Sequence, residues 1–408
     1  MKFAHFADLH LGSWRDQRIA GISTKAFLQA LEICKSEKVD FILISGDMFN
    51  TSLPSIDCLK DVVSALKNLK DSNIPVYIIA GSHDFSPTGK TMLDVLENAG
   101  LLANVMRGEV IDNKLKLKFT IDSKTGAKIT GIIGKKGMLG KAYYENLAKD
   151  NLESEEGFKI FMFHTSLSEF KPAELEKMES QPLSLLPKGF DYYAGGHVHY
   201  VFSKREPGYG LIAYPGPIFP NNVAEIEKLK YGGFYIVEAS GKDIKCRHIL
   251  LRIYSVVSFC FDCDHKNASD VEERAVASLK SSDLHGSIVT MRFWGKLKSG
   301  KPSDINFNAI VNFCYNNGAY FVMRNSSALT AEEFEEIKTG ASTVEGIEQS
   351  VISEHIGQIR CFSPEKEAET ASVLLSALNI EKEEGETTSD FEKRVRDDVS
   401  RLLGIELS

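Results

Sequence analysis

The sequence FAHFADLH, at residues 3–10, decides the fold because a short apolar run ends there in two side chains that can bind a metal ion. Residues 3–7 are apolar apart from His5, which is typical of a strand covered on both faces of its sheet. We expect His5 to be a core residue, since it lies inside this run. Asp8 and His10 follow directly, so chemistry is expected at the carboxyl end of this strand.

Four more apolar runs have the same design, and they lie at residues 41–44, 76–79, 160–163 and 192–194. Helical patterns at about 22–38 and 55–71 separate the first three runs. This alternation of strand and helix predicts an α/β fold in which helices flank the sheets. We therefore expect a layered α/β core over residues 1–242.

Each later run also ends in side chains that can bind a metal ion. The motifs are Gly46-Asp47, Gly81-Ser82-His83-Asp84, His164 and Gly195-Gly196-His197-Val198-His199. In α/β folds, sites form beyond the carboxyl ends of the strands, so these side chains should meet at one edge. The glycines before the aspartate and histidines allow the backbone to turn sharply and approach bound ions.

The residue types indicate hydrolysis of a phosphoester. Such a reaction needs a strong nucleophile at neutral pH and positive charge on the phosphoryl oxygens. Two divalent ions about 3.5–4 Å apart supply both, because they lower the pKa of a bound water and hold the phosphate. A mixture of imidazole and carboxylate ligands suits manganese, iron or zinc better than calcium or magnesium.

Each motif alone has a simpler explanation, since Asp-x-His and Gly-Asp are common in turns and a lone histidine is usually a core residue. The ordered set is more specific, because five of the ten histidines fall in motifs that follow buried-strand patterns. The other five histidines are expected to be structural, and they are His5, His248, His265, His285 and His355.

The series DLH, GD, GSHD, H and GGHVH resembles the calcineurin-like metallophosphoesterase superfamily over about residues 1–240. Within it, the chain looks most like the SbcD nucleases, also called the meiotic recombination eleven type. The opening KFAHFADLHLG, the stretch VDFILISGDMF, YPGP at 214–217 and GGFYIVE carry this likeness. The first half is specific, whereas the rest of the chain matches only in its layout.

The resemblance implies two Mn²⁺ ions per subunit and assigns their ligands. The first ion would be held by Asp8, His10, Asp47 and His199, and the second by Asp47, His164 and His197. Asp47 would bridge the two ions. In the family an asparagine also binds the second ion, and Ser82 occupies that position here. Serine is a shorter and poorer ligand, so we expect the second ion to bind more weakly.

The resemblance also implies a catalytic pair, in which His83 assists the transition state or the leaving oxygen and Asp84 orients it. The sequence departs from the pattern at two further positions, of which the first concerns the handling of DNA strands. Asn50 stands where many relatives have a histidine, and Pro217 replaces the usual serine.

A second unit is expected at residues 243–330, as a small α+β capping domain that positions the DNA substrate. Its predicted elements are a strand at 248–262, a helix at 269–281, a strand at 288–293, a helix at 303–316 and a strand at 319–323. The unit contains no cluster of catalytic residue types. A third unit, at 331–408, is predicted to be a helical tail.

The tail pattern predicts helices at 364–379 and 390–403, with capping signals at Thr330-x-x-Glu333, Ser363 and Ser389-x-x-Glu392. Their apolar stripes either pack on the preceding domain or dock a partner. The resemblance implies docking of an SMC-like ATPase of the SbcC type by this helix–loop–helix. The candidate docking residues are Leu374, Leu375, Leu378, Val395, Val399 and Leu402.

The resemblance implies a nuclease of DNA double-strand-break repair, acting as a 3'-5' exonuclease on duplex ends and an endonuclease on single strands. It also implies a homodimer. Helix 55–71 has more apolar residues than one core face needs, which fits a dimer or simply a core.

The net charge of −8 does not itself indicate nucleic-acid binding. The chain has no apolar run of membrane-spanning length, so we expect a cytoplasmic, nucleoid-associated protein with no membrane partner.

Two alternatives remain. One keeps the metal site but changes the substrate to a phosphoprotein or cyclic nucleotide. The other is a DNA-end-binding scaffold whose catalysis is weak because of Ser82.

Overall fold

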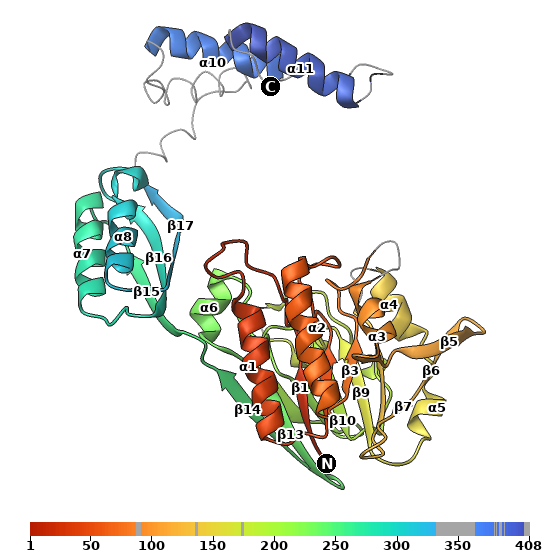
Figure 1. Cartoon of the computed structure of the whole chain (residues 1–408). Helices are drawn as coiled ribbons and strands as arrows, with labels where there is room; N and C mark the ends of the chain where they lie inside the picture. The colour runs from red at the N-terminus through yellow and green to blue at the C-terminus, as the bar shows by residue number, and fades with distance from the viewer. Residues whose placement is uncertain are drawn as a thin grey trace. The chain divides into compact units, whose positions relative to one another are not determined.

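The computed structural model describes residues 1–86, 91–134, 138–172, 175–331, 364–378, 380, 382, 386 and 388–403. Figure 1 shows the whole chain. The predicted α/β class is confirmed, since sheets are flanked by helices.

The first large sheet has six strands in the order β14-β13-β1-β2-β3-β4. Their bounds are β1 Lys2–Phe6, β2 Phe41–Ser45, β3 Val76–Ile79, β4 Ala103–Asn104, β13 Gly232–Ser240 and β14 Asp243–Leu251. Strands β1 to β4 run parallel, whereas β13 is antiparallel to both β1 and β14. The parallel strands place their carboxyl ends at one edge of the sheet.

The second large sheet also has six strands, in the order β11-β12-β10-β9-β8-β7. Their bounds are β7 Thr120–Ile121, β8 Lys128–Ile132, β9 Lys159–His164, β10 Tyr192–Gly196, β11 Phe202–Arg205 and β12 Leu211–Tyr214. Strands β8, β9, β10 and β12 run parallel. A separate hairpin pairs β5 Arg107–Ile111 with β6 Lys114–Lys118.

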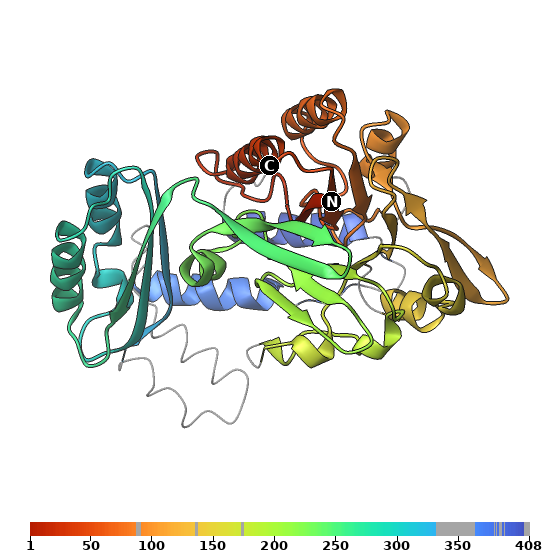
Figure 2. The same ribbon diagram turned by 90° about the horizontal axis from the view of Figure 1, so that it is seen from below.

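The two large sheets face each other across a shared core, in which Phe3 and Phe41 stack at 5.0 Å and the ring of Tyr192 meets Phe3 edge-on. On the outer face of the first sheet, helices α1 Ile22–Ser36 and α2 Ile56–Asp71 lie side by side (Figures 1 and 2). Their alternating apolar residues fill this outer core, as Phe27 and Leu66 illustrate. The expected layers are therefore present.

Short helices complete this part of the chain, and they are α3 Met92–Asn98, α4 Met138–Glu145, α5 Asp150–Glu153 and α6 Val223–Leu229. Helix α6 lies between β12 and β13 in sequence and contributes Ile226, which is fully buried, to the outer core. Helix α3 begins with a capping box made by Thr91 and Asp94. Each helix thus has a local signal or a core contact that fixes it.

The prediction of one strand over residues 248–262 was wrong. Strand β14 ends at Leu251, and β15, Ser255–Asp262, begins after a bend. The first strand pairs with β13 and the second pairs with β16, Ser287–Leu297, in a different sheet. The apolar stretch therefore contributes strands to two different sheets. Hydrophobic periodicity alone does not show where one strand ends and the next begins.

The predicted helices and strands after residue 262 are present with shifted bounds. They are α7 Ala268–Lys280, α8 Phe307–Asn316 and β17 Phe321–Ala331, and β15, β16 and β17 form one three-stranded sheet. Thr330 belongs to β17, so the expected start of a helix there was wrong. The chain divides into two compact units, of which one contains 1–262, 271–294 and 306–328. The other contains 263–270, 295–305 and 329–408.

The tail contains two helices, α10 Pro364–Leu378 and α11 Thr388–Leu403, which contact each other. Ser389 lies inside α11 rather than at its cap, while Glu333 and Ser363 lie outside the described residues. The predicted domain boundaries at 242 and 330 remain a prediction. No helix within the described ranges has the length and apolar character needed to cross a bilayer.

Candidate metal centre

The candidate site lies where the carboxyl ends of both large sheets meet. Asp8 follows β1, Asp47 follows β2, His164 ends β9 and His197 follows β10. The loops after β1 and β2 are joined by backbone hydrogen bonds, from the Asp8 amide to the Gly46 carbonyl at 3.1 Å and from the His10 amide to the Asp47 carbonyl at 3.0 Å. Two chain segments far apart in sequence therefore present their side chains into one space.

The backbone at this edge adopts an unusual conformation. Asp8, His10, Asp47 and His197 all have positive φ, at 52°, 41°, 52° and 88°. Residues with a Cβ rarely occupy this region, because it costs conformational energy that the surrounding structure must offset. Four such residues in one site indicate that the arrangement of their side chains is under functional constraint.

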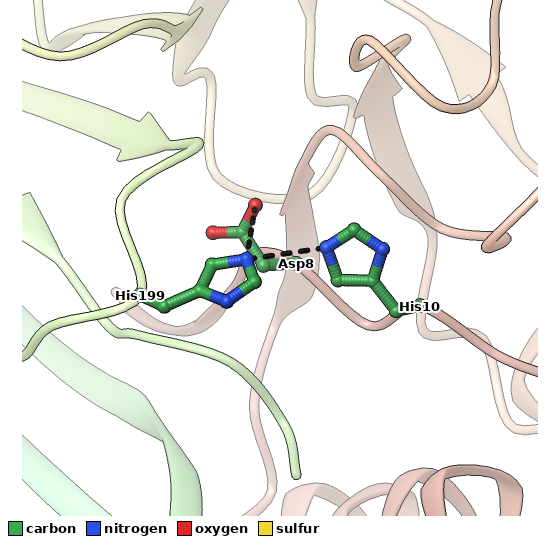
Figure 3. Close-up of side chains that lie close together, drawn as sticks. All are labelled: Asp8, His10 and His199. Atoms are coloured by element: carbon green, nitrogen blue, oxygen red, sulfur yellow. Dashed lines mark hydrogen bonds and ion pairs between the residues drawn. The ribbon is translucent and has the colours of Figure 1, made fainter. Parts of the chain in front are cut away.

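Asp8, His10 and His199 form the first group of possible ligands, and Figure 3 shows both imidazoles converging beside the carboxylate. The Nε2 atoms of His10 and His199 are 3.2 Å apart. Oδ1 of Asp8 lies 3.8 Å from Nε2 of His199. These distances place three potential donor atoms around one point.

Asp47 belongs to two further groups, one with His10 and His83 and one with Asp8 and His164. Its Oδ2 atom is 3.2 Å from Nε2 of His164 and 3.8 Å from Nε2 of His10. Within each group the donor atoms all lie within 4.8 Å of one another. Asp47 is therefore the carboxylate shared by neighbouring groups, as a bridging ligand must be.

The orientation of His164 shows why these donors suit a cation. Its Nδ1 atom donates to the carbonyl oxygen of Ser45 at 2.7 Å, which leaves a lone pair on Nε2. That buried Nε2 atom has no hydrogen-bond partner among the described residues, and it faces the Asp47 carboxylate. Against the effect of burial, Asp47 raises the pKa of His164, so positive charge is favoured at this point, and a divalent ion can take the place of the Nε2 proton between the ring and the carboxylate.

His199 is oriented in the same way. Its Nδ1 atom donates to Oε1 of Glu225 at 2.9 Å, so its Nε2 lone pair faces Nε2 of His10. A carboxylate behind a ligating imidazole fixes the ring and increases its basicity. The residues present therefore fit a divalent cation.

The charges of the buried groups lead to the same conclusion. Burial raises the pKa of Asp8 to about 6. Burial acts to raise the pKa of Asp47 too, but the adjacent His164 outweighs it and holds this pKa well below its usual range. Burial lowers and Asp47 raises the pKa of His164, with a net result of about 9. Protonated His164 supplies positive charge to Asp47 in the chain by itself, whereas Asp8 keeps a raised pKa, so a cation bound between these groups would favour the ionised form of both carboxylates.

His83 lies next to these groups, with its ring 4.8 Å from that of His10. Its Nδ1 atom donates to the backbone carbonyl of Asn50 at 2.8 Å, and its amide donates to Oδ1 of Asp47 at 2.7 Å. The Asn50 carbonyl therefore selects the tautomer of His83, so that Nε2 can exchange a proton.

The prediction that Asp84 orients His83 needs a correction, because the carboxylate bonds to the backbone instead. It accepts from the amides of Met48, Phe49 and Gly81, at 3.2, 3.0 and 3.0 Å. Burial, followed by the charge of Asp47, raises the pKa of Asp84 to about 6. Asp84 thus fixes the segment that ends in Asn50 and acts on His83 only indirectly.

Two further predicted ligands, His197 and Ser82, remain predictions. His197 is not part of the groups of His, Cys, Asp and Glu donors found among the described residues, and serine is not one of these residue types, so the groups leave Ser82 untested. The His197 ring lies 5.2 Å from that of His164, and its amide donates to both oxygens of Asp8. Ser82 is half-buried between Gly81 and His83.

Sequence reasoning missed Glu225 and Ser45, which hold His199 and His164. Glu225 had one local signal, the Asn222-x-x-Glu225 pattern of a helix start. The structure uses that pattern, since Asn222 accepts from the Glu225 amide at 2.9 Å. Its contact with His199 depends on the packing of α6, so no spacing in the sequence could predict it.

Residues 1–201 match the family model described as calcineurin-like phosphoesterase. Three similar proteins bear the name DNA double-strand break repair protein Mre11. The protein from Methanococcus maripaludis is 29% identical over 273 residues, which cover 62% of this chain and 69% of that protein. The Archaeoglobus fulgidus protein is 26% identical, covering 75% and 70%. The Methanocaldococcus jannaschii protein is 30% identical, covering 60% and 64%.

Three glycines are required by the close approach of the donor residues. A Cβ on Gly81 would lie 2.2 Å from Oδ1 of Asp47, one on Gly46 would lie 2.2 Å from Nδ1 of His164, and one on Gly196 would lie 2.0 Å from the Ser45 carbonyl. These contacts are too short for any real side chain, so the backbone would have to move.

We predict that Gly81→Ala weakens the binding of divalent ions by at least about tenfold, because its methyl group would displace Asp47. Gly21→Ala is the matched control, since no atom lies within 4 Å of its added Cβ. Isothermal titration with Mn²⁺ measures both variants. Equal affinity for Gly81→Ala and wild type would contradict the role given to Asp47.

Proposed function

We propose that the chain is a metal-dependent phosphoesterase of the calcineurin-like type and that it acts as a DNA nuclease in double-strand-break repair; the family match over residues 1–201 and the Mre11 relatives support this. The observation that carries the proposal is the sharing of Asp47 between donor groups at the carboxyl ends of two sheets. The choice of DNA as substrate is supported by the names of the relatives with 26–30% identity.

We infer that the donor groups hold two Mn²⁺ ions. Asp8, His10, Asp47 and His199 would hold the first ion, and Asp47, His164 and His197 the second, with Ser82 near it. When bound, such ions activate water and neutralise charge on the phosphate. The group of Asp8, Asp47 and His164 supports two neighbouring ion sites. In it, two buried carboxylates have donor atoms within 4.8 Å of the same imidazole.

His83 would act as the general acid that protonates the leaving oxygen. Its Nδ1 hydrogen is committed to the Asn50 carbonyl, so only Nε2 can give a proton to an oxygen or take one from it. A ring nitrogen of His83 lies within 4.8 Å of the donor atoms of His10 and Asp47, which is near enough to reach a phosphate held there. Asp84 would keep this geometry by holding the Met48–Phe49 backbone.

The substrate could instead be a small phosphate ester or a phosphoprotein, or the chain could bind DNA ends with little cleavage. The DNA nuclease that we propose would shorten duplex ends in the 3'-5' direction and cut single strands internally. Neither alternative predicts these products. Labelled duplex, single-stranded DNA and p-nitrophenyl phosphate should therefore be compared directly. Hydrolysis of the small ester without cleavage of DNA would favour a phosphatase.

We predict that His83→Ala lowers Mn²⁺-dependent cleavage of labelled duplex ends by roughly 10²–10⁴-fold while the ions still bind, since general acid–base catalysis contributes about that much. The exposed His285→Ala is the control and should cleave like wild type. Cleavage that survives unchanged in His83→Ala would remove the nuclease proposal.

We also predict that the two ions bind with unequal affinity, because the Ser82 hydroxyl is a weak neutral ligand. Isothermal titration of the wild type with Mn²⁺ should resolve one tight and one weaker site. Ser82→Asn should tighten the weaker site alone. Two equally tight sites in the wild type would refute this account of Ser82.

A homodimer is supported by two exposed apolar side chains, one at the first residue of α2 and one in the loop just before it. Ile56 is 83% exposed and Leu53 is 78% exposed, whereas Val62 and Leu66 of the same helix are buried in the core. Exposed aliphatic side chains of this kind often mark a protein interface. We therefore propose that Leu53 and the first turn of α2, rather than all the apolar residues of helix 55–71, contact a second copy.

The tail helices support docking of an SMC-like ATPase of the SbcC type. Leu375, Leu378 and Leu402 are 42%, 57% and 44% exposed, although α10 and α11 contact each other. Leu374, Val395 and Val399 are partly covered. The helix pair thus keeps an apolar stripe available to a partner, which a purely packed pair would bury.

We predict that Leu375→Glu and Leu402→Glu each abolish co-purification with the ATPase subunit and leave Mn²⁺ binding intact. Val373→Glu is a matched control, because Val373 is also 42% exposed but lies on the other face of α10. Co-purification that survives both changes would show that the docking assignment is wrong.

A further inference from the structure

Two carboxylates of helix α6 contact side chains from other parts of the chain, on opposite sides of the helix. Glu225 holds His199 of the candidate metal centre at 2.9 Å. Glu227 accepts from Arg292 of β16, at 3.0 Å from Nε and 2.5 Å from Nη2. Residues two apart on a helix point about 200° apart, so one carboxylate faces the metal centre while the other faces β16.

The Glu225 carboxylate is held by several donors at once. Oε1 accepts from His199 and from the Asn222 side-chain amide at 2.6 Å, and Oε2 accepts from the Asn221 amide at 2.8 Å. Because these bonds fix the carboxylate to the first turn of α6, it cannot turn independently of the helix. Any displacement of α6 must therefore displace the hydrogen-bond partner of His199.

Glu227 depends strongly on its partner. Its side chain is 18% exposed, and its Oε1 atom is buried without a hydrogen-bond partner among the described residues. The charge of this carboxylate is thus compensated by Arg292, which is 35% exposed. Removal of the arginine would leave a poorly solvated carboxylate, which is costly, so α6 is expected to shift until Glu227 reaches water.

Ile226 lies between the two carboxylates and is fully buried in the outer core. We therefore expect Ile226 to keep its place in the core if the short helix tilts. A tilt that moves Glu227 outward would move Glu225 relative to His199. The helix is too short, at seven residues, to absorb such a change by bending.

We propose that Glu225, Glu227 and Arg292 are positioning residues for the metal centre, in which α6 makes the orientation of the ligand His199 depend on the Arg292–Glu227 ion pair of the three-stranded sheet. The proposal rests on the metal centre of the proposed function. It adds that the centre is completed by a sheet that contributes no ligand.

The contact between α1 and the same sheet provides the comparison. Lys25 of α1 donates to the hydroxyl group of Tyr254 at 3.2 Å, and Tyr254 stacks on Tyr320 of the sheet region at 3.9 Å. Like the Arg292–Glu227 pair, this contact uses a cationic side chain to connect the three-stranded sheet region with a helix. The helix here is α1, and α6 takes no part. A change that merely loosens the sheet should therefore give the same result at Lys25 as at Arg292.

The test measures Mn²⁺ affinity of the full chain by isothermal titration, with urea unfolding measured in parallel. Glu225→Gln should weaken one site by about tenfold, as expected for loss of the carboxylate behind a ligating histidine. Arg292→Met should weaken the same site by roughly three- to tenfold, since coupling through a packed network is usually of that size. Lys25→Met should leave both sites as in the wild type.

The double variant Glu225→Gln/Arg292→Met tests whether both substitutions lower Mn²⁺ affinity through the same displacement of α6. If α6 transmits the change, Arg292→Met should cause no further loss in the Glu225→Gln background. Arg292→Lys, which keeps the charge but loses the two-nitrogen contact, should give a smaller loss and replaces Arg292→Met if that variant does not fold. Independent, additive losses would overturn the link.

Two outcomes separate this proposal from the proposed function. Failure of the wild-type chain to bind Mn²⁺ would overturn the metal centre and the link together. Binding by the wild type that Arg292→Met leaves unchanged, or that Lys25→Met weakens equally, would overturn the link alone. A loss of urea stability without a change in affinity would likewise assign Arg292 a structural role only.

Discussion

The site depends on the burial of two carboxylates beside each other and among imidazoles. Asp8 is fully buried and Asp47 is 2% exposed, and both lie against His164. Negative charges in such a space repel each other and lose their hydration, so they require positive charge at close range. The left-handed backbone at Asp8 and Asp47 and the absence of a Cβ at Gly81 serve this arrangement. The two stacked sheets provide the rigid frame that offsets its cost.

One hydrogen-bonding scheme fixes three of the histidines. In His83, His164 and His199, Nδ1 donates to an oxygen behind the ring, so Nε2 faces the site. The three acceptors are the Asn50 carbonyl, the Ser45 carbonyl and the Glu225 carboxylate, and they come from different segments. Ser45 is the last residue of β2 and Asn50 lies in the loop that follows it, whereas Glu225 belongs to a short helix. His199 is therefore the ligand whose position can depend on another part of the fold, which is the basis of the inference about α6.

The sequence could indicate the strand ends and most of the side chains that meet there, because each motif is local. An apolar run followed by Asp or His predicts both a strand and a possible metal ligand at its end, as at Phe3–His10. It could not indicate the partners of those side chains. The family resemblance implied that Asp84 orients His83, yet Asp84 bonds to the amides of Met48, Phe49 and Gly81, and His83 bonds to Asn50. Hydrogen bonds between loops depend on the loop conformation, which adjacency in sequence does not specify.

By itself, the sequence determined the α/β layering and the residue types at the strand ends, since periodicity and turn chemistry act within a few residues. The tertiary structure alone decided that the apolar run around Arg252 divides between two sheets and that Glu225 reaches His199. It also decided that His164 turns its unpaired Nε2 atom toward Asp47. Each of these features needs segments separated by many residues to be brought within about 3 Å, and only the packing of the whole domain sets such distances.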